Sequence, residues 1–495
     1  MIFLFSRAVE NYAQSWEWLK PLGYTDSVFS GSNLKRSSTG NLLITYFSET
    51  GAVLKSDLAF CNSTGDTLWK KEFPNLAIHD TYIDSVDNIY FAGSFINTLN
   101  INGTIINSYG DKDAIIGILD SNGNYLKHVA FGTDTSETAY SIDVYHHQVF
   151  ATGTYRKSFS LDGLSFTGNG KQNIFMLKLD SNLVALKKFQ TSQDSITGNA
   201  FAYKIGVGKN DSVYFYGGSY GIMKFDSTYI YSSCQVLAKF SNDLELGWAK
   251  QIACYGYYLP SFCFDSHKNL IMTYYANGGG GWSLELEVHK FDPEWNMIWM
   301  KTVPVCITGY LDVDDSDNVW IAGVHSNEFV SPPRFSVVKL SPSGMLTQVI
   351  YDTTIAHGLH GFAVKKNNDF YIIGNCMMGS YLGAYTCSPQ GSGFLAHYGS
   401  DGLSNIHSYV SPEKFQVFPN PAQGRFTLQL NNELQKNIQQ GAMIYIYDQL
   451  GNCILRQKLS NSSTQQFDIS KLAKGNYFIE VETEKERIAK KLILN

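Results

Sequence analysis

One unit of four short predicted strands recurs along most of this chain. Its clearest copy is DKDAIIGILDSNGNYLKHVAFG, residues 111–132, followed by AYSIDVYHHQVFATG, residues 139–153. In each stretch two runs of β-forming residues flank a turn, and the turn at 120–123 has the Asp, Asn and Gly typical of hairpins. The chain has 31 Tyr, 31 Phe and 43 Gly but only 17% charged residues, which favours an all-β protein rich in turns.

Both halves of this unit are present seven times. The second half is clearest at 84–93 and 314–323, and each copy lies about 49–62 residues from the next, a period typical of four-stranded propeller blades. Turns that follow a strand mark the first half at 62–66, 120–123, 178–182, 239–243, 290–293, 339–344 and 398–402. Weaker copies of the second half lie at 36–46, 145–153, 208–217, 265–274 and 365–374.

The two ends of the repeat region complement each other. The repeat region begins with a copy of the second half of the unit, at 36–46, and ends with a copy of the first half, at 398–402. In addition, the segment WEWLK at 16–20 matches LWKK at 68–71. We therefore expect the N-terminal segment and residues 391–402 to share one blade. That closure predicts a seven-bladed β-propeller over residues 15–407, whereas a linear solenoid would need capping repeats. The repeat resembles the β-propeller repeats of secreted and surface proteins of Gram-negative bacteria over residues 28–405, and this resemblance implies an extracellular setting but no fixed catalytic residues.

A different pattern begins after a linker at 408–414. Residues 415–495 read as alternating strands separated by Gly, Pro and Asn turns, which predicts a small Ig-like β-sandwich. This segment has ten basic and seven acidic residues, a net charge of +3, so the rest of the chain carries −9 of the total −6. The shift in charge supports a separate domain.

Three motifs in this segment occur in a characteristic order: FPNP at 418–421, YDQLG at 447–451, and LAKGNY at 472–477 with a terminal KKLI at 490–493. Together they resemble the type A C-terminal sorting domain of the type IX secretion system. The resemblance implies passage through the periplasm to the cell surface, with the secretion machinery, a sorting peptidase and anionic lipopolysaccharide as partners. The residues that carry it are Pro419, Asn420, Pro421, Asp448, Gly451, Gly475, Tyr477, Lys490 and Lys491.

The N-terminus and the cysteines leave alternatives open. Residues 1–14 read either as the remnant of a signal peptide or as an ordinary chain end, and no run approaches the ~20 apolar residues of a membrane-spanning helix. The eight cysteines are scattered without a CxxC pair, which argues against zinc. Cys254 with Cys263, and Cys376 with Cys387, could form disulfides in an exported protein, and buried free thiols are the alternative for all four.

Several clusters suggest chemistry, and each also has a plain structural interpretation. Carboxylates at 312–317 could bind Ca²⁺, but the aligned copy at 84–88 indicates a turn; the weak metal candidates are Asp312, Asp314, Asp315 and Asp317. The histidine pairs at 146–147 and 357/360 lack further ligands, and the glycine run at 278–281 lacks the Lys-Ser/Thr of a phosphate loop.

Aromatic residues crowd the region between residues 255 and 282 and could stack on sugar rings, although packing between blades is the alternative. They are Tyr255, Tyr257, Tyr258, Tyr274, Tyr275 and Trp282. No catalytic triad, paired-carboxylate motif or cofactor motif is present, so no cofactor is expected, and the net charge of −6 gives no reason to expect nucleic acid. The sequence thus predicts a surface binding or adhesion protein. The alternative is a glycan hydrolase or lyase with its site at the channel mouth, which converging carboxylates in a deep pocket would favour.

Overall fold

The structure is a computed structural model in which two compact units are distinguished, Ser15–Gly399 and a second unit that contains Ser400–Asn495. Each unit is considered by itself. The residues that the structure describes are 15–22, 31–50, 53–101, 103–193, 199–231, 234–254, 261–276, 285–303, 310–325, 334–352, 356–365, 369–376, 381–382, 385–386, 393–399, 415–431, 434–435, 442–447, 453–482 and 487–494.

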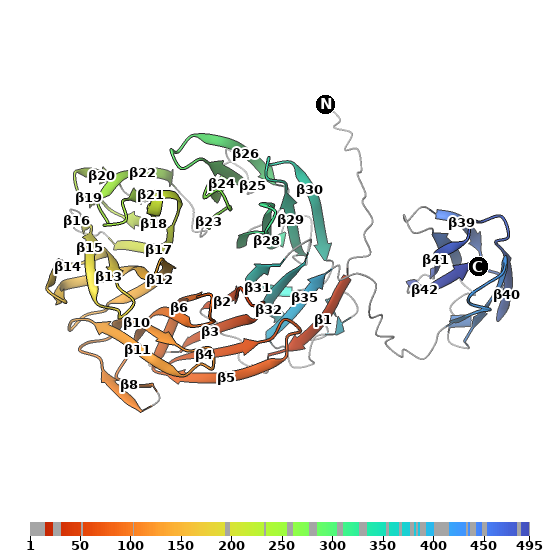
Figure 1. Ribbon diagram of the computed structural model, residues 1–495, viewed down its shortest axis with the longest axis horizontal. Coiled ribbons are helices and arrows are strands. Elements are labelled where there is room, and N and C mark those ends of the chain that lie inside the picture. Colours follow the sequence, from red (N-terminus) through yellow and green to blue (C-terminus); the bar gives the residue numbers. More distant parts are fainter. Residues whose placement is uncertain are drawn as a thin grey trace. The chain divides into compact units, whose positions relative to one another are not determined.

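The described residues of the first unit form seven groups of four antiparallel strands (Figure 1), called sheets below. A parallel pairing of Gln172 with Asn199 joins the third and fourth groups into one eight-stranded sheet. The chain is therefore all-β, as its composition predicts. The first four sheets are β2 (Gly31–Arg36), β3 (Leu42–Thr50), β4 (Val53–Cys61) and β5 (Thr67–Pro74); β6 (Leu76–Ile83), β7 (Ile89–Phe95), β10 (Asp113–Leu119) and β11 (Tyr125–Phe131); β12 (Thr138–Tyr145), β13 (Gln148–Leu161), β14 (Leu164–Leu179) and β15 (Ala185–Gln190); and β17 (Asn199–Val207), β18 (Val213–Tyr220), β21 (Cys234–Phe240) and β22 (Leu246–Cys254).

The remaining three sheets follow the same order, except that the last one recruits a strand from the N-terminus. They are β23 (Phe262–Phe264), β24 (Leu270–Ala276), β25 (Glu285–Phe291) and β26 (Met297–Val303); β27 (Tyr310–Val313), β28 (Val319–His325), β29 (Arg334–Leu340) and β30 (Leu346–Asp352); and β31 (Ala356–Val364), β32 (Phe370–Cys376), β35 (Gly393–Gly399) and β1 (Ser15–Pro21). Short strands outside these sheets are β8 (Thr98–Ile101), β9 (Thr104–Asn107), β16 (Ser192–Gln193), β19 (Met223–Phe225), β20 (Thr228–Ile230), β33 (Tyr381–Leu382) and β34 (Tyr385–Thr386).

The first strands of consecutive sheets lie beside one another. Contacts join β2 to β6, β6 to β12, β12 to β17, β23 to β27, β27 to β31, and β31 back to β2. Between β17 and β23, the Lys204 ammonium donates a hydrogen bond of 2.6 Å to the carbonyl of Phe262. The series of contacts thus returns to its start, and Figure 1 shows the sheets following one another around a common centre.

Strand β1 pairs with β35, so the two segments that the sequence expects to share a sheet do so. Trp18 lies opposite His397, and Lys20 lies opposite Leu395. Buried His397 also forms ion pairs with Glu17 of β1, at 2.8 Å, and with Asp369. Charged as well as backbone contacts therefore join the N-terminal strand to this sheet.

A repeated contact joins the outer strand of one sheet to a turn of the next. Trp69 of β5 covers Gly123, and its indole N–H donates a hydrogen bond of 2.8 Å to the carbonyl of Ser121. A Cβ at Gly123 would lie 2.9 Å from this ring, and the backbone φ there is +70°, so only glycine fits without strain. Trp18 covers Gly65 and Trp299 covers Gly344 in the same way. We call these three the outer contacts, and they explain why Trp and turn Gly recur in the repeat.

The second unit has two antiparallel sheets with one shared core. One contains β36 (Phe415–Phe418), β37 (Arg425–Leu430) and β40 (Thr464–Asp468). The other contains β38 (Met443–Tyr447), β39 (Cys453–Lys458), β41 (Gly475–Glu482) and β42 (Arg487–Leu494). Buried side chains from both sheets, including Phe426 and Ile444, pack together. In the described part of the chain, no helix is long and apolar enough to cross a membrane.

Candidate ligand-binding cavity

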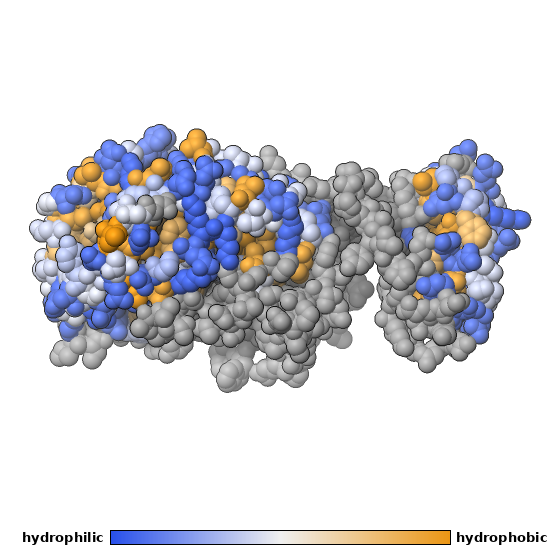
Figure 2. Space-filling view, turned by 90° about the horizontal axis from the view of Figure 1, so that it is seen from below, coloured by the Kyte–Doolittle hydropathy of each residue, from blue (hydrophilic) through white to orange (hydrophobic). Residues whose placement is uncertain are grey.

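The first strands of all seven sheets line a cavity of about 720 Å³ in the first unit. This volume lies within the range of small-molecule and cofactor sites in proteins. The outer surface of the described residues shows no comparable sign of a binding site. In the view of Figure 2, hydrophilic and hydrophobic residues are mixed over the described surface. Exposed large side chains such as Leu68, Tyr109 and Met345 lie far apart in the sequence, in β5 and in two connections between strands.

Ten charged residues line this cavity. Five of them come from five different sheets: Lys35, Asp80, Asp143, Lys204 and Asp312. The others are Arg36, Lys268, Asp314, Asp315 and Lys365. The ammonium of Lys35 lies 3.5 Å from Asp80, and attraction by that carboxylate raises the pKa of Lys35. Burial raises the pKa of Asp143 and of Asp312, and it lowers the pKa of Lys204, because a low-dielectric environment disfavours the charged form.

Two of the carboxylates join neighbouring first strands. Asp143 of β12 accepts hydrogen bonds from the backbone N–H of Val144, at 2.9 Å, and of Val207 in β17, at 2.8 Å. Asp312 of β27 accepts the equivalent bonds from Val313 and from Val364 in β31, both at 2.9 Å. Each carboxylate therefore uses both oxygens to hold two sheets together.

Asp80 has a similar but more crowded environment. It accepts hydrogen bonds from Asn33, at 3.1 Å, and from the Ser141 hydroxyl, at 2.7 Å. Backbone N–H groups of Thr81, at 2.9 Å, and Ile142, at 3.2 Å, complete its partners. Carboxylates therefore do converge on a cavity, and Asp80, Asp143 and Asp312 each accept hydrogen bonds from the protein.

Lys204 differs from these groups because its hydrogen-bonding capacity is not used up. Its three N–H donors make one hydrogen bond among the described residues, to Phe262, and the ammonium lies 5.1 Å from the centre of that ring. No carboxylate of the described chain lies within ion-pair distance of it. The ammonium therefore has donors available to a molecule in the cavity.

Three cavity residues occupy β-bulges, in which one strand carries an extra residue. His79 in β6, Tyr140 in β12 and Tyr203 in β17 each stand at the register shift against the second strand of their sheet. We call them the rim residues. Bulges redirect side chains and are frequent beside functional sites. Sequence reasoning missed all three residues, because a bulge leaves the alternating pattern with only a one-residue slip.

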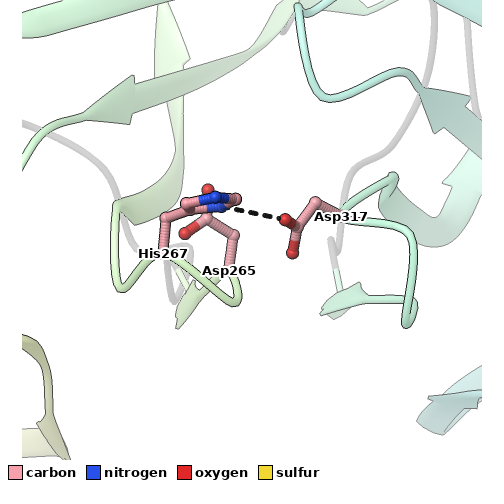
Figure 3. A group of neighbouring side chains, drawn as sticks. All are labelled: Asp265, His267 and Asp317. Carbon is pink, nitrogen blue, oxygen red and sulfur yellow. Dashed lines mark hydrogen bonds and ion pairs between the residues drawn. The ribbon is translucent and has the colours of Figure 1, made fainter.

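A possible metal-binding group lies outside the cavity centre. Carboxylate and imidazole atoms of Asp265, His267 and Asp317 lie within 4.8 Å of one another (Figure 3). However, Asp265 contacts the Lys290 ammonium at 2.8 Å and caps its own turn through Asn269. Asp317 accepts hydrogen bonds from Ser266 and contacts His267 at 3.2 Å. Both carboxylates therefore have protein partners, and the contacts of Asp317 with Ser266 and His267 join two neighbouring turns.

The acidic candidates at 312–317 have separate positions. Asp314 is buried in the turn after β27 and accepts bonds from Ser316, Asn318 and the Trp320 indole. Asp317 has a left-handed φ of 60° and reaches the neighbouring turn, while Asp312 and Asp315 line the cavity. The hydrogen-bond partners of Asp314 and Asp317 named here are all protein groups.

The structure places the aromatic and histidine candidates as follows. Tyr274 and Tyr275 lie in β24, while Tyr255, Tyr257, Tyr258, Trp282 and the glycine run at 278–281 lie outside the described residues. His146 and His147 form the exposed turn between β12 and β13. His357 and His360 lie in β31.

Cys263 is a free thiol that lines the cavity, so the possible disulfide with Cys254 is not formed. Cys263 belongs to the inner strand of the fifth sheet, whereas Cys254 ends the outer strand of the fourth. Burial raises the pKa of the Cys263 thiol. Cys387, the partner proposed for Cys376, and residues 1–14 lie outside the described residues.

The described residues of the sorting motifs gather near β42. Asn420 accepts a hydrogen bond of 2.8 Å from the backbone N–H of Ile493, between the exposed Pro419 and Pro421. Tyr477 is buried in β41 and donates a bond of 2.6 Å to the carbonyl of Ala473. Gly475 begins β41, and Lys490 and Lys491 lie in β42, opposite Ile479 and Phe478. Asp448 and Gly451 lie outside the described residues.

Residues 416–495 match the family described as the secretion system C-terminal sorting domain. This match covers the segment that resembles a type IX sorting domain and supports that assignment. The chain is therefore exported to the cell surface or secreted, and its sorting domain interacts with the type IX machinery. No curated protein matches the chain.

Solved structures show only distant similarity. One is a protein of unknown function from Bacteroides caccae, at 10% identity and a TM-score of 0.37, which covers 63% of this chain and 93% of that one. A second is the acylaminoacyl peptidase of Pyrococcus horikoshii, at 10% identity and a TM-score of 0.42, which covers 84% of this chain and 59% of that one. A third is the polysaccharide lyase Uly1, at 10% identity and a TM-score of 0.41, which covers 80% of this chain and 94% of that one. At TM-scores below 0.5, these likenesses carry no argument about function.

Proposed function

We propose that residues 15–407 form a seven-bladed β-propeller that binds a glycan or protein ligand at its central cavity, in an exported surface binding or adhesion protein. The observation that carries this proposal is the cavity itself, which the first strands of seven sheets line with unlike, charged and aromatic side chains. The returning series of first-strand contacts and the β1–β35 pairing support the closed propeller.

The hydrogen bonds that the cavity carboxylates make to the protein favour binding over catalysis. A general acid or base must reach the proton that it transfers. Asp80, Asp143 and Asp312 instead hold neighbouring strands through hydrogen bonds to backbone N–H groups. The alternative, a secreted glycan hydrolase or lyase, keeps one argument in its favour, because five aspartates line one cavity of ligand size.

A binding screen that also follows product release separates the two functions. The full-length secreted protein would be applied to a panel of immobilised polysaccharides and surface proteins, with retention and new reducing or unsaturated ends both measured. We expect retention without cleavage. Release of new ends would establish the enzyme, and failure to retain any member of the panel would contradict the proposed binding function.

We also propose that a surface peptidase removes the sorting domain and that the product is attached to lipopolysaccharide. Deletion of residues 416–495 should leave the protein in the periplasm. Fractionation of cells that express the deletion and the full chain tests this. Normal surface display of the truncated protein would contradict the assigned route.

A further inference from the structure

The rim residues lie on three consecutive sheets, and two of them have neighbouring rings. The His79 and Tyr140 ring centres are 5.0 Å apart, and the Phe47 ring of β3 lies 4.8 Å from that of His79. The Tyr203 ring packs against its own sheet, 5.5 Å from the ring of Tyr216. All three rim residues line the cavity, so aromatic residues of β6, β12 and β17 contribute to its wall.

Three independent bulges produce this arrangement. In regular strands, the residue at each bulge would pair with the second strand of its sheet; here the pairing skips His79, Tyr140 and Tyr203 in turn. A bulge interrupts the hydrogen-bond ladder and is kept where it redirects a side chain. The three bulges all place a ring on the wall of the same cavity.

The groups beside these rings suit a neutral ligand that is rich in hydroxyl groups. The cavity is lined by five cationic residues and five aspartates, so their formal charges balance and give no net attraction to an ionic ligand. The hydroxyls of a neutral molecule accept from the Lys204 ammonium, and its apolar ring face packs against tyrosine.

We propose that His79, Tyr140 and Tyr203 form a stacking subsite for a neutral sugar ring of a glycan, with the Lys204 ammonium as hydrogen-bond donor to its hydroxyls. This rests on the proposed binding function and adds the ligand class and the residues that recognise it. The aromatic residues around 255–282 are not needed for it.

The test compares variants of the full-length protein on neutral probes (dextran, mannan and laminarin) and acidic probes (polygalacturonate and hyaluronate). We expect at least one neutral polysaccharide to bind. The variants Y140A and Y203A should each weaken that binding about tenfold, which corresponds to ~1.4 kcal/mol. Y140F and Y203F should stay within about threefold of the wild type, because a phenyl ring preserves stacking.

An exposed tyrosine pair elsewhere supplies the matched control. Tyr229 and Tyr231 lie 6.5 Å apart at and just beyond β20, outside the cavity lining, and Y229A/Y231A should bind normally. The phenylalanine variants guard against misfolding, which circular dichroism also checks. Unchanged affinity in both Y140A and Y203A would overturn the subsite while leaving cavity binding intact. Exclusive retention on acidic probes would overturn the ligand class, and binding of a protein alone would overturn the glycan inference but not the proposed function.

Discussion

The outer and inner strands of the first unit differ in how far their residues repeat from one sheet to the next. On the outer strands, the same contact is repeated: Trp18, Trp69 and Trp299 each cover a turn glycine of the next sheet. On the inner strands, equivalent positions carry unlike residues. The residue that directly follows the bulge is Asp80 in β6, Ser141 in β12 and Lys204 in β17. In β31, the residue after the register shift is Gly361.

Within one repeat, the outer strand therefore serves the stability of the fold, and we expect the inner strand to serve ligand binding. The Trp and Gly of the outer contacts recur in three of the sheets, and in each they hold the next sheet. The residues at the equivalent inner positions differ from one another, and two of them, Asp80 and Lys204, line the cavity. Changes to the outer strands should therefore alter stability alone, while changes to the inner strands should affect ligand binding.

The largest expected effect on stability comes from an outer contact. Trp69→Ala removes the ring over Gly123, the stacking on Phe60 and the hydrogen bond to Ser121. We expect a loss of about 3 kcal/mol in the free energy of unfolding, measured by urea denaturation. Affinity for the ligand should not change, whereas a large loss of affinity in the folded variant would remove the distinction between outer and inner strands.

A smaller loss is expected when a cavity carboxylate is removed. Asp143→Ala leaves the N–H groups of Val144 and Val207 without their acceptor, which should cost about 2 kcal/mol. Asp134→Ala provides the control: this exposed carboxylate pairs with Lys157, at 2.7 Å, and its removal should cost much less stability than the removal of Asp143, because solvent screens a surface ion pair. Equal costs in thermal denaturation would show that Asp143 does not join the two strands.

Lys204→Met should act in the opposite direction on stability. Burial lowers the pKa of Lys204 in the folded protein, so the unfolded chain binds its proton more tightly and the wild type is penalised at neutral pH. The variant should melt a few degrees higher at pH 7. This advantage should shrink as the pH rises through the lowered pKa of the folded protein towards the ordinary lysine pKa of 10.5, because the wild-type side chain then also becomes neutral.

The same substitution should weaken ligand binding, since methionine has no N–H donor. Melting curves at pH 7 and pH 10, with affinity measured at pH 7, test both effects. A variant that is less stable at pH 7, or that binds the ligand normally, would show that Lys204 is retained for structure and not for the ligand.

The sequence predicted the repeated part of the molecule better than the part that differs between repeats. Trp69, Gly123 and the turn aspartates form local patterns that recur with a fixed period, so the all-β fold and the partnership of β1 with β35 could be expected from them. The sorting domain could be expected for a similar reason, because its motifs keep a fixed order. The cavity could not: His79 and Tyr140 meet only because two bulges, 61 residues apart, face the same space.

The most direct test of the account uses the free thiol of Cys263 inside the cavity. The rate at which a small maleimide modifies Cys263 would be measured by peptide mass spectrometry, with and without a saturating amount of the retained ligand. Buried Cys61, the other free thiol of the described chain, lies in β4 outside the cavity lining and serves as the internal control. A ligand in the cavity should slow modification of Cys263 at least tenfold and leave Cys61 unchanged. Equal rates for Cys263 with and without the bound ligand would place the binding site elsewhere.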